Sequence, residues 1–260
     1  MGSGTNAFQE LLRGPLGTHV PGWVLAMTAA LIAVGIAIAL ISVIAMFSVW
    51  LERKVSGHIQ CRYGPMYVGW HGWLQSIADG VKLLLKEDII PRGADRALFV
   101  LAPALVLGAI LAAMAAFPLA PAIYFADIDL GLFFILALSS MTTIGVVMAG
   151  WASNSKWSLF GAMREAAQVV AYEVPLGISL LVPVMAAGTL DLREASAMQS
   201  GAWGMAWLVF QNPFVLPAFV LFFVAALAET KRAPFDLPEA ESELVAGFMT
   251  EYSGIRWSFF

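Results

Sequence analysis

The sequence has 260 residues, of which 60% are hydrophobic and only 12% are charged. Soluble domains carry about 25% charged residues, so this chain has too few charges to cover the surface of a soluble enzyme. The net charge of −4 gives no basic field for nucleic acid. The single cysteine, Cys61, allows neither an intrachain disulfide nor a self-contained iron–sulfur cluster. The composition indicates a polytopic membrane protein.

Apolar runs long enough to cross a bilayer as helices recur along the chain. We expect an all-α polytopic membrane protein with about six transmembrane helices in a single membrane domain, residues 1–260. The expected spans are residues 23–51, 97–119, 130–152, 162–187, 213–228 and 244–260. The first run is too long for the apolar core of a signal peptide, so we interpret it as a retained anchor.

Lysine and arginine are unevenly distributed among the predicted loops. The first, third and fifth loops hold seven, two and two of them, whereas the N-terminal segment and the second and fourth loops hold one, none and one. By the positive-inside rule, the odd loops face the cytoplasm and the N-terminus lies outside. The charged cytoplasmic loops are therefore expected at residues 52–96 and 229–243.

The first loop is predicted to contain an amphipathic helix. Apolar residues recur at helical spacing from Trp73 to Leu85, while Asp79, Lys82 and Lys86 fall largely on other faces. Such a helix is suited to lie in the membrane interface, where a passive anchor is the alternative interpretation.

Glu173 lies well inside the fourth apolar run, and Arg164 and Glu165 mark the entry to that run. A carboxylate in hydrocarbon costs several kcal/mol, so such residues usually face a polar interior and mark proton or ion paths. Pro175 cannot donate a backbone hydrogen bond, which predicts a kink in this helix. The alternative is a buried carboxylate paired with a cation for packing alone.

The fifth loop concentrates carboxylates among apolar and stiff residues. Glu239 and Glu243 are four residues apart and share one face of a helix. Crowded like charges raise one another's pKa, so a group of this kind can exchange protons near neutral pH. A solvated acidic loop is the alternative, but Phe235 and Leu237 are too apolar for a flexible tail.

No glycine-rich phosphate loop and no metal-ligand spacing occurs, so we expect no flavin, iron–sulfur cluster or metal bound by this chain.

Two segments carry long and specific motifs. The first combines Glu52-Arg53-Lys54, Gln60-x-Arg62-x-Gly64-Pro65 and Ala78-Asp79-Gly80-x-Lys82. The second is Glu229-Thr230-x-Arg232-Ala233-Pro234-Phe235-Asp236-Leu237-Pro238-Glu239-x-Glu241-x-Glu243, and it continues in Thr250-Glu251-Tyr252-Ser253-Gly254. On these motifs, nearly the whole chain closely resembles the family of H subunits of NADH:quinone oxidoreductase, respiratory complex I.

The resemblance implies a membrane subunit that lines the quinone-binding tunnel, anchors the hydrophilic arm and couples quinone reduction to proton translocation. Quinone, such as ubiquinone, is then a substrate bound together with partner subunits, and the redox centres belong to other chains. The implied partners are the hydrophilic subunits of the quinone site, the adjacent small membrane subunits and the lipid bilayer of the bacterial inner membrane. Members usually continue beyond Phe260, so we expect a C-terminally truncated chain.

The residues that match functional positions of the family fall into two sets. The set expected at the quinone tunnel or chamber comprises Glu52, Arg53, Arg62, Asp79, Arg232 and Asp236. The set expected in proton coupling comprises Arg164, Glu173, Glu229, Glu239, Glu241, Glu243 and Glu251.

Three other functions remain open at this point. A homologous membrane subunit of a membrane-bound hydrogenase need not bind quinone, although the complete Arg62-x-Gly64-Pro65 motif favours the quinone branch. A stand-alone ion transporter would be extracted from membranes as a single species, whereas a complex subunit would co-purify with partners. In a purely structural anchor, the carboxylates could be neutralised without consequence.

Overall fold

The computed structural model describes residues 22–120, 123–126, 128–201, 206–237 and 241–260. Within these ranges the chain divides into two compact units. The first unit contains the described residues up to Ile89 together with Ser253–Ser258, and the second contains Ile90–Tyr252 with Phe259–Phe260. The single membrane domain expected from the sequence stays a prediction.

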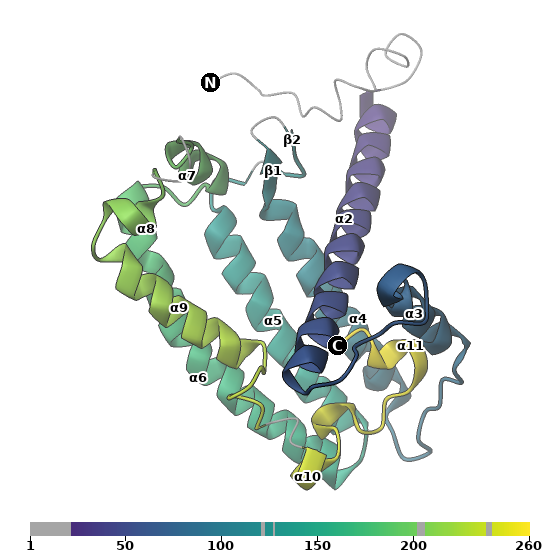
Figure 1. Cartoon of the computed structure of the whole chain (residues 1–260). Coiled ribbons are helices and arrows are strands. Elements are labelled where there is room, and N and C mark those ends of the chain that lie inside the picture. Colours follow the sequence, from purple (N-terminus) through teal and green to yellow (C-terminus); the bar gives the residue numbers. More distant parts are fainter. Residues whose placement is uncertain (1–21, 121–122, 127, 202–205, 238–240) are drawn as a thin grey trace. The chain divides into compact units, whose positions relative to one another are not determined.

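The first unit is built on one long helix. Helix α2 spans Gly22–Ile59 and contains no proline, so the first predicted span continues as helix through its charged end. After a 3-10 turn at Trp70–Gly72 the chain forms α3, Gln75–Leu85, which is the predicted amphipathic helix. The short helix α11, Gly254–Trp257, completes this unit (Figure 1).

Aromatic and backbone contacts fix the turn before α3 on α2. The indole Nε1 of Trp50 donates to the carbonyl oxygen of His71 at 3.1 Å, and the rings of Trp50 and Trp73 meet edge to face with centroids 6.3 Å apart. Gly72 has φ = +75°, and a Cβ there would lie 2.3 Å from the carbonyl oxygen of Pro65. Only glycine fits this turn, so the first loop has a defined course after α2.

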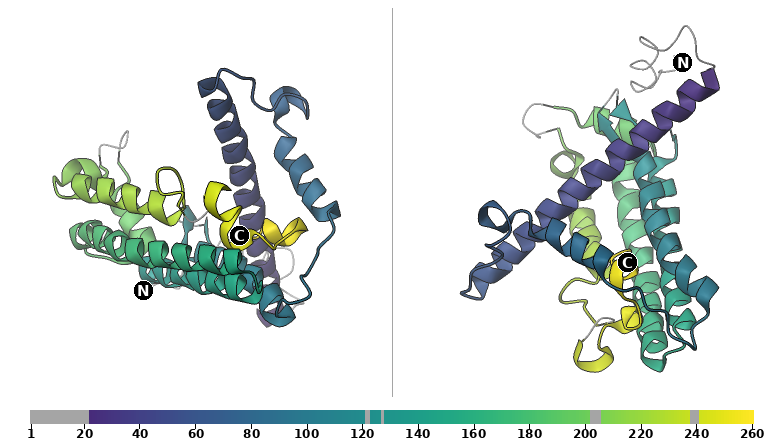
Figure 2. Two further views of the ribbon diagram at one scale, coloured as in Figure 1. Left: turned by 90° about the horizontal axis from the view of Figure 1, so that it is seen from below. Right: turned by 90° about the vertical axis from the view of Figure 1, so that its right-hand side faces the viewer.

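The second unit is a bundle of long helices with shorter elements between them. Its elements are α4 (Arg96–Ala113), a 3-10 turn (Met114–Ala116), β1 (Pro118–Ala120), β2 (Ile123–Tyr124), α5 (Gly131–Ala152), α6 (Lys156–Ala187), α7 (Leu192–Met198), α8 (Leu208–Gln211), α9 (Val215–Glu229), α10 (Glu241–Leu244) and the 3-10 turn η4 (Gly247–Met249). Helices α4, α5, α6 and α9 lie side by side in the views of Figures 1 and 2. Apart from the two-stranded ribbon of β1 and β2, the described elements are helical, which confirms the all-α class.

Small residues allow the helices of this bundle to approach closely. A Cβ on Gly145 of α5 would lie 2.4 Å from Cγ2 of Val106 on α4. A Cβ on Gly150 of α5 would lie 2.3 Å from the Cβ of Ala162 on α6. Small residues at such contacts are typical of helices that pack within membranes.

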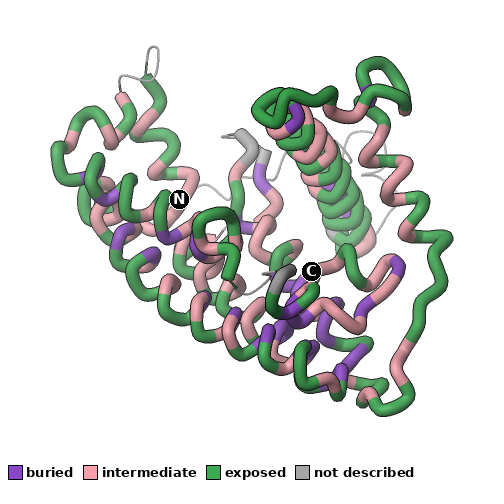
Figure 3. Tube along the Cα trace, turned by 60° about the horizontal axis from the view of Figure 1, so that its bottom comes forward, coloured by how far each residue is buried: buried purple, intermediate pink, exposed green. Residues whose placement is uncertain are grey.

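The best-packed part of the second unit includes its C-terminal residues. The rings of Phe99 on α4 and Tyr252 are stacked with centroids 4.0 Å apart, and the Tyr252 hydroxyl donates to the carbonyl oxygen of Phe99 at 3.2 Å. Phe248 of η4 is also almost fully buried in this cluster. Figure 3 shows buried residues gathering around the C-terminal part of the chain.

Four helices in the described residues are long and apolar enough to cross a membrane: α2, α4 with its 3-10 extension, α5 and α6. Helix α9 is apolar but shorter, with 15 residues. Most large apolar side chains on these helices are exposed. The chain is therefore a multi-pass membrane protein, and an exposed apolar surface of this kind suits contact with lipid.

Two predicted spans differ from the structure. The fourth, predicted from residue 162, is part of a longer helix because α6 begins at Lys156 and includes Arg164. The sixth, residues 244–260, is not one helix but α10, η4 and α11 in succession. Val245, Gly247 and Gly254 have positive φ values of 67°, 55° and 60°, and this left-handed conformation interrupts a right-handed helix.

Candidate functional site

In the first unit, an ion pair joins two residues of the predicted quinone set. Nη1 of Arg53 on α2 lies 2.6 Å from Oδ2 of Asp79 on α3, and Gln75 also donates to this carboxylate at 3.4 Å. The hydrogen bond from Arg53 holds the pKa of Asp79 below its usual value, although partial burial acts in the opposite direction. Asp79 is therefore ionised at neutral pH and fixes α3 to the charged end of α2.

The other two members of this set in the first unit lie at the same end of α2. Glu52 is exposed and directly precedes Arg53. Nε of Arg62 donates to Oε1 of Gln60 at 2.7 Å, so this guanidinium is oriented by a neighbour in its own motif.

In the second unit, one face of helix α6 supports the loop that follows α9. The side-chain amide of Gln168 donates to the carbonyl oxygens of Ala228 at 2.8 Å and Phe235 at 2.9 Å. One turn further along, the ring of Tyr172 packs edge to face on Phe235, with centroids 5.3 Å apart. The carbonyl of Ala228 is near the end of α9, where regular helical hydrogen bonding stops, and Gln168 adds a shorter side-chain bond to the backbone bond that this carbonyl accepts from Lys231. Residues 230–237 are thus held on α6 at both ends.

Two ion pairs lie on α6 before Gln168. Nη1 of Arg164 is 2.6 Å from Oε2 of Glu243, so the pairing brings together two residues of the predicted coupling set. The adjacent Glu165 is almost fully buried and pairs with Lys231, two residues after the end of α9. These pairs explain how charged residues are accommodated inside a long apolar helix.

Of the residues in the predicted coupling set, Glu173 and Glu229 have the surroundings that best fit proton exchange. Oε1 of Glu173 on α6 is buried and has no hydrogen-bond partner within the described part of the chain. Glu229, the last residue of α9, is near enough for the two carboxylates to repel each other electrostatically. Two acidic groups in an apolar bundle, one with a buried unpaired oxygen, can hold or pass protons.

The remaining predicted residues follow α9 in the sequence. Arg232 and Asp236 are exposed on the loop of residues 230–237, and Glu251 is half-buried beside Tyr252. Glu239 lies outside the described residues. Glu241 begins α10, but its side chain is also outside what the structure describes.

Sequence reasoning alone misses the residues that organise α6. It marks Glu165 only as part of the entry to the fourth span, and it does not single out Gln168 or Tyr172. Their spacing contains a usable signal, because positions 164, 168 and 172 recur every four residues and share one helix face. Their loop partners are far away in sequence and could not be identified in the same way.

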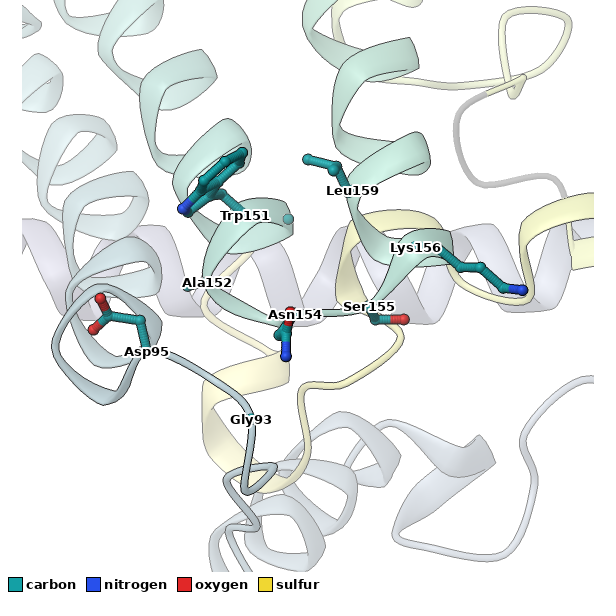
Figure 4. A pocket seen from close by; sticks show the side chains of 9 residues that line it. Gly93, Asp95, Trp151, Ala152, Asn154, Ser155, Lys156 and Leu159 are labelled. Atoms are coloured by element: carbon teal, nitrogen blue, oxygen red, sulfur yellow. The ribbon is translucent and has the colours of Figure 1, made fainter.

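The second unit also has an open hollow of about 540 Å³ between the α5–α6 connection and the segment before α4 (Figure 4). Asn154 and Lys156 line one side and Asp95 the other. The Asp95 carboxylate accepts from the backbone amides of Ala97 and Leu98, so it caps α4. None of the predicted site residues lines this hollow. Among the described residues, no three His, Cys, Asp or Glu side chains gather to hold a metal ion.

Comparison with known proteins gives a consistent result. The family model described as NADH dehydrogenase matches residues 31–260. The chain is 45% identical over 261 residues to the NADH-quinone oxidoreductase H subunit of Chlorobium luteolum, which covers 99% of this chain and 68% of the relative. It is 48% identical over 250 residues to the H subunit of Anaeromyxobacter dehalogenans (94% and 60%) and 49% identical over 245 residues to that of a Geobacillus species (92% and 70%). The chain thus spans between 60% and 70% of the length of these curated relatives.

Proposed function

Because this chain belongs to the family of NADH-quinone oxidoreductase H subunits, we propose that it is the membrane subunit that couples quinone reduction to proton translocation in that complex. In this role it lines the quinone tunnel, anchors the hydrophilic arm and holds no redox centre of its own. Quinone binds together with the hydrophilic subunits, and the adjacent small membrane subunits receive the coupling. The complex resides in the bacterial inner membrane, with the N-terminus of this chain outside and its charged loops on the cytoplasmic side.

The observation that carries this proposal is the pair Glu173 and Glu229. The buried oxygen of Glu173 lacks a hydrogen-bond partner in the described residues, and the nearby charge acting on Glu229 has the same sign. An arrangement that served packing alone would place a cation or donor beside such a carboxylate, because an unpaired buried polar group is costly. A proton bound to either group would reduce both the cost of burial and the repulsion.

The charged end of α2 supplies the proposed quinone side of the mechanism. Reduction of quinone to quinol takes up two electrons and two protons, so the charge of the chamber changes during turnover. The ion pair of Arg53 and Asp79 gives this region a fixed charge pattern at neutral pH. Glu229 and Glu173 respond to this change of charge by exchanging a proton.

The proposal is tested by Glu229→Gln and Glu173→Gln in the intact complex. We expect quinone reduction to continue while the number of protons translocated per quinone reduced falls. Glu194→Gln is the matched control. Glu194 is a carboxylate of the same unit but belongs to a different helix, α7, and it accepts a hydrogen bond from the hydroxyl of Thr189 at 2.7 Å. Wild-type quinone reduction and wild-type proton translocation in both test variants would refute the assigned roles.

A further inference from the structure

The chain leaves helix α9 through a turn that lysine does not favour. Lys231 has φ = +54°, in the left-handed region. The backbone amide of Arg232 donates to the carbonyl oxygen of Leu227 at 3.1 Å, and that of Lys231 donates to the carbonyl oxygen of Ala228 at 3.3 Å. This is the Schellman arrangement, whose left-handed residue is usually glycine and sometimes asparagine. A lysine there has its Cβ crowded against the backbone, which carries a cost that a favourable interaction of its side chain can offset.

The side chain of Lys231 makes that interaction with a buried carboxylate. Its ammonium group pairs with Glu165, whose side chain is only 2% exposed. The same nitrogen lies 4.9 Å from the ring centroid of Phe248, within the range of a cation–π contact. One ammonium group therefore joins helix α6, the end of α9 and the η4 turn.

These three segments surround the residues to which the proposed function assigns coupling. Glu229 ends α9 and is only two residues before Lys231, while α6 carries both Glu165 and Glu173. Any displacement of the end of α9 from α6 would change the separation of Glu229 and Glu173. Gln168 holds the same junction through the carbonyl of Ala228, but this neutral contact resists charge-driven movement less than an ion pair does.

We propose that Lys231 is a positioning residue that, through Glu165, holds Glu229 and the beginning of the loop of residues 230–237 against α6 while quinone is reduced. The ion pair of Lys231 and Glu165 fixes the beginning of the loop on α6. A change of charge in the loop therefore alters the electrostatic field at Glu229 and does not move Glu229 away from α6. This inference rests on the proposed coupling function. It adds the contact that keeps Glu229 and Glu173 at a fixed separation.

The test compares single and double variants in the intact complex. Lys231→Asn removes the ammonium group but keeps a residue that tolerates the left-handed conformation. Since either single substitution leaves one buried charge without its partner, the double variant Glu165→Gln/Lys231→Asn removes both charges and keeps the complex assembled. In Lys231→Asn and in the double variant, protons translocated per quinone reduced should fall at least roughly twofold, the factor that corresponds to the weakest couplings between contacting residues. Lys231→Arg keeps the charge and should restore the wild-type ratio.

Assembly is measured separately, as electron transfer from NADH to a soluble acceptor that bypasses quinone. A structural role alone would lower all activities in proportion to the amount of assembled complex and leave the ratio unchanged. Lys156→Asn is the matched control, because Lys156 is exposed at the start of the same helix and its nitrogen lies over the neighbouring Trp157 ring. The control should keep the wild-type ratio.

The outcomes separate this inference from the function on which it rests. A wild-type ratio in the double variant, or a lowered ratio that Lys231→Arg does not restore, would overturn the positioning role. If Glu229→Gln lowers the ratio while Lys231→Asn does not, the coupling function stands and the role of Lys231 falls. If Glu229→Gln and Glu173→Gln leave the ratio unchanged, the coupling function itself falls.

Discussion

Gly161 on α6 provides a sharp test of the packing between this helix and the η4 turn. A Cβ at Gly161 would lie 2.6 Å from the Cα and carbonyl carbon of Gly247 and 2.7 Å from the backbone nitrogen of Phe248. The favourable separation of non-bonded carbon atoms is about 3.5–4.0 Å, so the η4 turn would have to move away from α6 by about 1 Å. The hydroxyl of Ser158, one turn earlier, donates to the carbonyl oxygen of Phe248 at 2.8 Å in a buried position, and this bond would be distorted as well.

The expected cost of Gly161→Ala follows from these distances. Forced overpacking typically costs about 1–3 kcal/mol when the neighbouring atoms are backbone and cannot rotate away. Alanine also gains about 1 kcal/mol over glycine in helix propensity, which partly hides this cost. Gly177→Ala cancels that gain in the comparison, because Gly177 is in the same helix and a Cβ there meets nothing within 4 Å. The difference between the two alanine variants is therefore about 1–3 kcal/mol.

The assay is the temperature at which half of this chain is lost from the detergent-soluble fraction of the purified complex. At roughly 2–4 °C per kcal/mol for a chain of this size, Gly161→Ala should be lost several degrees below Gly177→Ala. Equal midpoints for the two variants would show that the backbone of η4 does not approach α6 as closely as the structure has it.

Three further substitutions probe single contacts. Gln168→Met keeps the size of the side chain but removes both amide donors, so limited proteolysis should cut the loop after α9 several times faster than in the wild type; an unchanged rate would contradict the two bonds. Tyr252→Phe removes the buried hydroxyl bond to Phe99 and should lower the free energy of unfolding by about 1 kcal/mol, measured by the same solubility assay. Because Arg53 lowers the pKa of Asp79, the ion pair contributes stability above the ordinary aspartate pKa, and this is lost only as the pH falls through the lowered value. Protection of the first loop from acid-active protease should therefore persist to about pH 4 in the wild type. Asp79→Asn should show weaker protection above that pH, and the difference from the wild type should disappear once Asp79 is protonated.

Most of the helical architecture could be predicted from the sequence because it depends on local patterns. The uninterrupted apolar run of α2 and the helical periodicity of α3 are both contained in short windows of sequence. In each case the information needed is within the segment itself. The ends of these helices are harder to predict, since α2 continues to Ile59 through residues that composition assigns to a loop.

The beginning of α6 shows why local patterns fail where charges are paired over long distances. In the sequence, Arg164 and Glu165 mark the boundary of the fourth span because a charge inside hydrocarbon is unfavourable. Their partners, Glu243 and Lys231, come from beyond the end of α9 and lower that cost. No window of sequence contains both members of either pair, so the first two turns of α6 could not be assigned to the helix.

The same limitation explains the two interpretations of Glu173 that the sequence leaves open. A carboxylate in an apolar helix either is paired for packing or is kept for proton exchange, and composition does not distinguish the two. The neighbouring charge divides these cases for two carboxylates on α6. Glu165 pairs with the ammonium group of Lys231, whereas Glu173 acts on Glu229, a second carboxylate. If Glu165 serves to fix geometry and Glu173 to carry charge, neutralising Glu165 together with Lys231 displaces Glu229, whereas neutralising Glu173 leaves the geometry intact and removes the proton carrier. The two substitutions therefore affect coupling for different physical reasons, although both replace a glutamate by glutamine in one helix.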